Sequence, residues 1–140
     1  IQDGTGPAWY LLDVSRALKP FIFQKRRDYD FKAMTKPDDE GVFMRNEFRF
    51  GVDARVNAGY GLWQFAYCSH APLTKDNYAA ARAAMRGFKH DGGRTLGVMP
   101  RLLVVPPELE APARRIVVKD ESGGNEWAGS AEVLSPEFLG

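Results

Sequence analysis

Few residues in this sequence have a type and spacing that could perform chemistry. Cys68 and His70 lie two residues apart, and His90 and Asp91 follow in another part of the chain. A Cys and His metal site needs more soft ligands at fixed spacing, so a packed cysteine at a strand end is the better interpretation. Ser69 and His70 are adjacent, and adjacent strand residues point to opposite faces of a sheet. We therefore expect no catalytic, cofactor or metal site, and no enzyme.

Two other patterns also resemble functional sites but are better explained by local structure. The run Asp38–Glu40 could hold a divalent cation, but it lies between Pro37 and Gly41, as a solvated turn would. The glycines at 59–61 and 92–93 lack the spacing, and the following Lys and Ser or Thr, of a phosphate-binding loop. Glycine at these places is better explained by backbone conformation.

The best binding motif is the basic and aromatic stretch Phe23–Lys32. Three consecutive basic residues at 25–27 lie between aromatic residues in the sequence. Basic residues among aromatic rings can hold single-stranded nucleic acid. Asp28 and Asp30 interrupt the stretch, so the edge of a hairpin carrying protective charges is favoured. A small nucleic-acid-binding or protein-binding module that uses this stretch is the alternative function.

Composition predicts one globular domain over residues 1–140. The chain is 44% hydrophobic, and its 19 Lys and Arg residues nearly balance its 18 Asp and Glu residues. A dedicated nucleic-acid or membrane surface is therefore not indicated. The single cysteine excludes an internal disulfide. Because the chain starts with Ile1 and has no signal-peptide pattern, we expect a fragment, a processed product or an engineered chain.

The predicted elements give an α+β fold with a mixed sheet and two main helices. Helices are expected at 75–88, after the N-cap Thr74, and from Pro107 to 117, although Pro112 is awkward inside a helix. Strands are expected at 9–14, 20–24, 42–50, 62–67, 102–105 and 131–135. Residues 51–61 either form a loop or continue the sheet.

Four long blocks resemble one known family. They are WYLLDVSRALKPFIFQKR (9–26), VFMRNEFRFGVDARVNAGYGLWQFAY (42–67), NYAAARAAMRGFKHDGGRTLGVMPRLLVVPPELEAPAR (77–114) and AGSAEVLSPEFL (128–139). The chain thereby resembles the Mu-like prophage major head subunit, the gpT family of phage capsid proteins. The resemblance implies part of the Hong Kong 97-type capsid fold, namely the axial domain and part of the peripheral domain.

The resemblance also implies a function and its partners. A major capsid subunit binds copies of itself in the virion shell, after assembly in the host cytoplasm, and performs no catalysis. Scaffold and portal proteins are implied as further partners, with no membrane and no specific nucleic acid. The helix at 75–88, the 106–117 segment and the loop at 120–129 would belong to the axial domain, and strands 42–50 and 60–67 to the peripheral sheet.

Specific side chains are expected to serve packing or association. Arg45, Arg49, Arg82 and Arg86 are candidates for ion pairs between subunits, although a solvated face explains each of them as well. The expected core is Trp9, Phe21, Phe23, Leu103, Val104 and Val133.

The order of the blocks differs from the order that the resemblance implies. Residues 73–140 would come first in the family and residues 1–72 would end it, so we expect a circularly permuted C-terminal half. Cys68–Thr74 would then be a junction on a short surface turn, and residues 1 and 140 would lie between neighbouring strands at 131–135 and 9–14. The family's N-arm, extended loop and spine helix would be absent, so we expect a monomer or small oligomer rather than shells.

Overall fold

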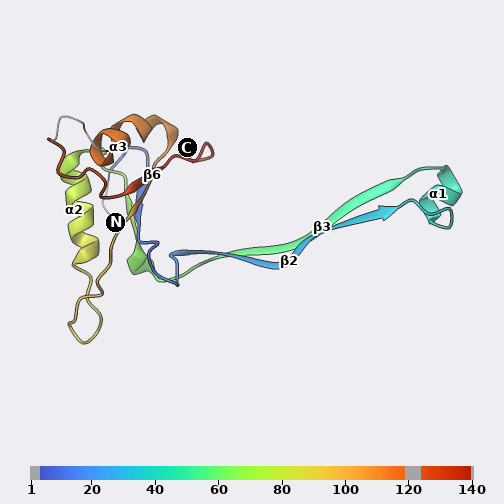
Figure 1. Ribbon diagram of the computed structural model, residues 1–140, viewed down its shortest axis with the longest axis horizontal. Helices are drawn as coiled ribbons and strands as arrows, with labels where there is room; N and C mark the ends of the chain where they lie inside the picture. The colour runs from blue at the N-terminus through green and yellow to red at the C-terminus, as the bar shows by residue number, and fades with distance from the viewer. Residues whose placement is uncertain (1–3, 119–123, 140) are drawn as a thin grey trace. The chain divides into compact units, whose positions relative to one another are not determined.

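A computed structural model describes residues 4–118 and 124–139. Contacts within it divide the chain into two compact units, the first formed by residues 1–20 and 60–140 and the second by residues 21–59 (Figure 1). The first unit is called the sheet unit and the second the hairpin unit. The prediction of a single domain over residues 1–140 stays a prediction.

Within the described residues, the sheet unit contains a four-stranded mixed sheet in the order β4-β1-β5-β6. Its strands are β1 (Trp9–Leu12), β4 (Ala66–Ser69), β5 (Leu102–Val104) and β6 (Glu132–Leu134). Strand β1 is antiparallel to both β4 and β5, whereas β5 and β6 are parallel. The mixed sheet agrees with the prediction. A parallel pair needs a crossover, and here residues 105–131, which include helix α3, supply it.

Two helices form in the sheet unit where the sequence predicts them, but over shorter ranges: the first ends at Arg86 instead of residue 88, and the second becomes α-helical at Glu110 instead of Pro107. Helix α2 (Lys75–Arg86) starts after Thr74, whose Oγ1 accepts a hydrogen bond from the backbone N–H of Asn77 at 3.2 Å. A 3-10 turn, η2 (Pro107–Leu109), leads into α3 (Glu110–Val117). Pro112 is the third residue of α3, where a backbone N–H would lack an intrahelical partner, so the missing donor costs no helical bond.

The core of the sheet unit lies between the sheet and helices α2 and α3 (Figure 1). Trp9 is fully buried, and its ring N–H donates to the Ala71 carbonyl at 2.8 Å. The largest fully buried apolar side chains are Trp9, Leu11, Tyr78, Met85, Val98, Leu103 and Val105. Of the other predicted core residues, Val133 packs against this core while partly exposed, and Val104 is half-buried.

The segment between β4 and α2 is closely packed. Ala71 and Leu73 are buried, and the Gly6 N–H donates to the His70 carbonyl at 3.1 Å. A Cβ added to Gly4 would lie 2.2 Å from the same carbonyl oxygen, so the backbones touch there. The expectation of a surface turn as a simple junction is therefore wrong.

Strands β1 and β6 belong to one sheet, but β5 lies between them. The expectation that they are neighbours is therefore wrong. Residues 1 and 140, whose positions were also predicted, lie outside the described residues.

The hairpin unit is formed by two long strands and a short helix. Strand β2 (Phe21–Met34) and strand β3 (Arg49–Tyr60) form a two-stranded sheet within the described residues, and α1 (Glu40–Arg45) lies between them. Residues 51–60 thus continue the sheet, which was one of the two alternatives. The predicted burial of Phe21 and Phe23 is wrong, because these β2 side chains are 48% and 70% exposed.

The predicted strand over residues 42–50 is wrong except at its end, because only residues 49 and 50 belong to β3. Asp39 accepts a hydrogen bond from the Lys36 N–H at 2.9 Å and closes a turn, after which α1 begins. Asn46 ends the helix in the left-handed conformation, with φ of 53°, and its N–H donates to the Val42 carbonyl. Asparagine tolerates this conformation better than most residues. The chain must reverse between β2 and β3, and this local geometry overrides the two-residue periodicity.

Candidate functional site

The chemically suggestive residues are used in local structure and are not brought together. The His70 ring lies 3.1 Å from the Gly6 carbonyl, and the His90 ring accepts the Gly92 N–H at 2.9 Å. Ser69 is buried, and its Oγ accepts the N–H of Ala71. Among residues 4–118 and 124–139, no group of three His, Cys, Asp or Glu side chains is placed to hold a metal ion.

Asp13 is a fully buried carboxylate at the end of β1. Its two oxygens accept hydrogen bonds from the Ser15 N–H and hydroxyl and from the Met99 N–H, at 2.5 to 2.9 Å. Burial acts to raise the pKa of Asp13, but these hydrogen bonds and the nearby Arg16 charge together lower it below its ordinary value. The carboxylate ties β1 to the segment before β5, which is a structural role that the sequence did not reveal.

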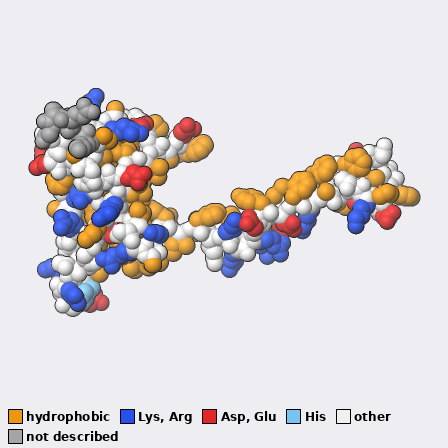
Figure 2. Space-filling view, in the orientation of Figure 1, with side chains coloured by type: hydrophobic (Ala, Val, Ile, Leu, Met, Phe, Trp, Pro, Cys, Tyr) orange, Lys and Arg blue, Asp and Glu red, His pale blue; other side chains and the backbone are white. Residues whose placement is uncertain are grey.

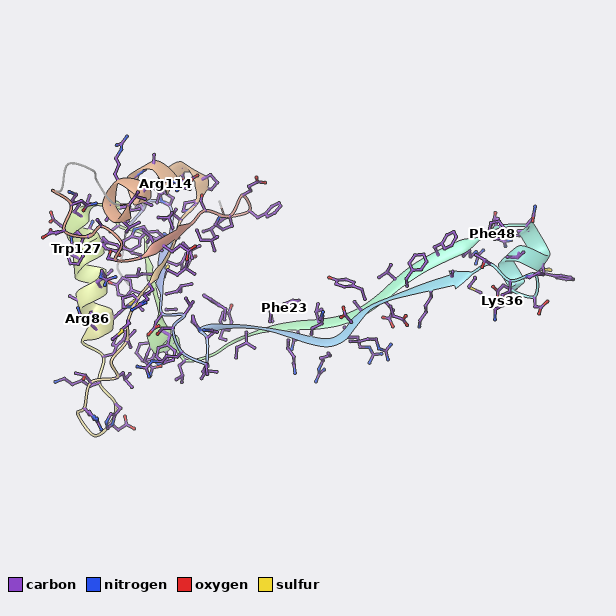
Figure 3. All side chains as sticks on the ribbon, viewed as in Figure 1. Phe23, Lys36, Phe48, Arg86, Arg114 and Trp127 are labelled. Carbon is purple, nitrogen blue, oxygen red and sulfur yellow. The ribbon has the colours of Figure 1, made fainter. Side chains whose placement is uncertain are left out.

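The hairpin unit exposes many large apolar side chains. In β3 every second residue from position 50 is apolar, and the Phe50 and Phe31 rings stack with centroids 5.7 Å apart. Figure 2 shows hydrophobic side chains gathered along one long edge of β2 and β3, and Figure 3 shows the exposed ring of Phe48 near the tip. The exposed large apolar side chains of this unit are Phe21, Ile22, Phe23, Tyr29, Phe31, Met34, Phe43, Met44, Phe48, Phe50, Val52 and Val56. This set is called the apolar hairpin surface.

The basic residues of the Phe23–Lys32 stretch are partly neutralised. Lys25 pairs with Asp28 at 2.9 Å, and Arg27 pairs with Asp53 of β3 at 2.7 Å. Hydrogen bonds from Lys25 and from the Tyr29 N–H lower the pKa of Asp28. Because carboxylates pair with these cations, the stretch is poorly suited to binding a polyanion such as nucleic acid.

A second feature is a concave surface on the sheet unit, called the arginine cleft. Its volume is 660 Å³, and its lining residues are Arg82, Arg86, Met99, Pro100, Arg101, Gly129, Ser130, Ala131 and Glu132. Three arginines thus face one carboxylate among the described lining residues. The cleft joins the second half of α2 to the segments that enter β5 and β6.

The four arginines predicted to pair between subunits have different surroundings. Arg82 donates from one guanidinium nitrogen to the Pro100 and Ser130 carbonyls, at 2.8 and 3.1 Å, and lies over the Tyr78 ring. Arg82 therefore serves its own chain, and Arg49 lies 3.8 Å from Glu47. Arg45 and Arg86 are exposed, and Figure 3 labels Arg86 on α2. Pairing between subunits stays a prediction for all four.

None of the helices in the described residues combines the length and the apolar character needed to cross a membrane.

Comparison with known sequences gives one consistent family. The family model described as "Mu-like prophage major head subunit gpT" matches residues 1–139. The major capsid protein of Escherichia phage Mu is 41% identical over 145 residues, covering 99% of this chain and 48% of that protein. The Mu-like prophage FluMu major head subunit of Haemophilus influenzae is 43% identical over 123 residues, covering 85% of this chain and 40% of that protein. The chain spans about half the length of these relatives or less.

Comparison with solved structures gives the same fold. A chain from the procapsid of bacteriophage JBD30 matches with a TM-score of 0.85 and 43% identity, over 99% of this chain and 47% of that one. A chain from the bacteriophage JBD30 capsid matches with the same TM-score of 0.85 at 20% identity, over 100% and 50%, which shows the fold alone. The predicted α+β capsid fold is confirmed.

These matches also bear on the alternative of a binding module and on the predicted circular permutation. They name capsid proteins throughout, and nothing in them supports the alternative of a small binding module. They cover the chain from end to end and do not show a permuted order of its segments. The circular permutation therefore stays a prediction without support from the comparisons.

Proposed function

Because the chain belongs to the Mu-like prophage major head subunit gpT family, we propose that it is a structural part of a phage head shell. In this role it binds copies of itself and performs no catalysis. Its place is the virion, with assembly in the host cytoplasm. Scaffold and portal proteins are the further partners that such a shell requires.

The apolar hairpin surface is the observation that carries this proposal. Phe23, Phe31 and Phe50 are 70%, 65% and 62% exposed, and they belong to one hairpin. Soluble monomers rarely expose contiguous apolar patches beyond a few hundred Å², and larger ones mark interaction sites. An isolated two-stranded hairpin is at best marginally stable in water. A hairpin of this length with this surface is therefore suited to being covered by other copies.

The outer strand edges of the hairpin support the same conclusion. In a two-stranded sheet each strand leaves one row of N–H and C=O groups unpaired, and such rows are templates for another chain. The ion pairs Lys25–Asp28 and Arg27–Asp53 place charges along this ribbon. Charges of this kind limit unspecific pairing and leave association to a matching partner.

Sedimentation velocity over a concentration series tests the proposal. The wild-type chain is expected to form small reversible oligomers, because copies cover one another's apolar hairpin surfaces. The variant Phe31→Ser/Phe50→Ser should shift association to at least about tenfold higher concentration, since it removes the stacked pair.

The matched control is Phe138→Ser. Phe138 is 97% exposed but belongs to the sheet unit, so its replacement should leave association unchanged. A wild-type chain that stays monomeric at every concentration would overturn the proposal. Equal sedimentation of the wild type and the double variant would also count against it.

A further inference from the structure

We propose that the arginine cleft of one copy binds the carboxylates of Asp38, Asp39 and Glu40 at the hairpin tip of a second copy. This inference rests on the proposed self-association and names one of its contacts. It joins a cationic concave surface on the sheet unit to the densest acidic run among the described residues.

The cleft is held in shape by interactions that leave two arginines available. Arg82 is fixed by its bonds to the Pro100 and Ser130 carbonyls, and it lies over the Trp127 ring with a centroid distance of 5.8 Å. Arg86 and Arg101 are exposed, and neither forms an ion pair with any residue that the structure describes. The cleft therefore has one arginine held by its own chain and two whose guanidinium groups pair with no carboxylate among the described residues.

The chemistry of these groups favours carboxylates as ligands. Guanidinium groups present planar sets of N–H donors that match carboxylate oxygens in pairs. Glu132, the carboxylate within the described lining, cannot balance the three arginines. A short acidic segment that brings two or three carboxylates would neutralise the cleft.

The hairpin tip supplies such a segment. Asp38 and Glu40 are exposed, and Asp39 is half-buried because it closes the turn with Lys36. Strand β2 has 14 residues, so the tip lies about 45 Å from the strand's start. The two exposed carboxylates, Asp38 and Glu40, then meet the two exposed arginines, Arg86 and Arg101.

A nucleic-acid phosphate is the competing ligand for the cleft. The chain as a whole carries a formal net charge of only +1, and Glu132 lies in the cleft itself. A polyanion surface usually requires a broad basic stripe. The charge balance therefore favours an acidic protein segment over nucleic acid as the ligand of the arginine cleft.

Disulfide trapping between two separately made chains tests the contact. Both carry Cys68→Ser; one adds Pro37→Cys beside the tip carboxylates, and the other adds Met99→Cys in the cleft. Oxidation of the mixture should give the mixed dimer. A matched pair of chains with Asp91→Cys in place of Met99→Cys should give at least about tenfold less mixed dimer, because the 91–94 loop does not line the cleft.

Charge reversal then separates this contact from general association. Arg86→Glu/Arg101→Glu in the cleft chain, or Asp38→Lys/Glu40→Lys in the tip chain, should lower trapping at least about tenfold, and combining them should restore it. Trapping no greater than the control, or unaffected by reversal, overturns the inference. If oligomers still form in sedimentation, the proposed function stands; if they do not, both fail. Binding of labelled single-stranded DNA that is lost in Arg86→Glu/Arg101→Glu, without trapping, also overturns the inference in favour of nucleic acid.

Discussion

Asp13 and Arg82 show how single charged side chains hold the sheet unit together. Each joins segments far apart in the sequence, Asp13 reaching Met99 and Arg82 reaching Ser130. Both satisfy backbone groups near the strand entries, so their roles are structural. A buried polar group that loses its partner costs more than the bond itself contributes.

We expect Asp13→Asn to lower the free energy of unfolding by about 2 kcal/mol near neutral pH, because an amide nitrogen would face a donor. The pKa of Asp13 is lower in the folded state than in the unfolded state. The carboxylate therefore contributes its full share to the free energy of unfolding at pH values above the ordinary carboxyl pKa. That contribution is lost as the pH falls through the depressed folded pKa. Urea unfolding of both proteins should therefore show a difference that shrinks below about pH 4. A difference independent of pH would contradict this assignment.

Arg82→Met should destabilise the chain by about 1–3 kcal/mol, since the Pro100 and Ser130 carbonyls lose their donor. Arg86→Met on the same helix is the matched control. It should change stability by no more than about 0.5 kcal/mol, because Arg86 is exposed. Thermal unfolding followed by circular dichroism measures both, and equal losses would refute the role given to Arg82.

At the scale of elements, the sheet unit follows from local sequence signals. Thr74 caps α2, and Pro107 opens the turn before α3. An apolar run at 102–104, with Leu103 fully buried at its centre, becomes β5. These elements were predictable because propensity, capping and burial agree at each of them.

The hairpin unit was harder to predict because its apolar residues are not buried in this chain. Phe21 and Phe23 look like core residues in the sequence, yet both are exposed. The alternation at 42–50 indicated a strand, but the turn at Asp39 and the left-handed Asn46 enclose a helix there. The arginine cleft was missed as well, because Arg101 lies far from Arg82 and Arg86 in sequence and only the fold brings them together.

Capping of α2 gives a prediction at this scale. Thr74→Ala should lower stability by about 1 kcal/mol, because the Asn77 N–H loses its acceptor. Thr74→Ser retains the hydroxyl and should remain within a few tenths of a kcal/mol of the wild type. Chemical denaturation of the three proteins measures this, and equal losses for both variants would show that the hydroxyl is not the cause.

At the scale of the whole molecule, the two units differ in how far they bury their own apolar side chains. The sheet unit has its own buried core, which explains how it can be stable. The hairpin unit exposes most of its large apolar side chains, which suits a surface completed by neighbouring copies. Repeated copies of one contact, each of modest strength, are sufficient to build a closed symmetric assembly.

Amide hydrogen exchange across a concentration series tests this central claim most directly, because it reports on β2 and β3 individually. As the concentration rises, the amides of β2 and β3 should become markedly more protected. Those of β1 and β5 should remain unchanged, since their partners lie in the same chain. If β2 and β3 exchange at the same rate at every concentration, association does not cover the hairpin and the account is contradicted.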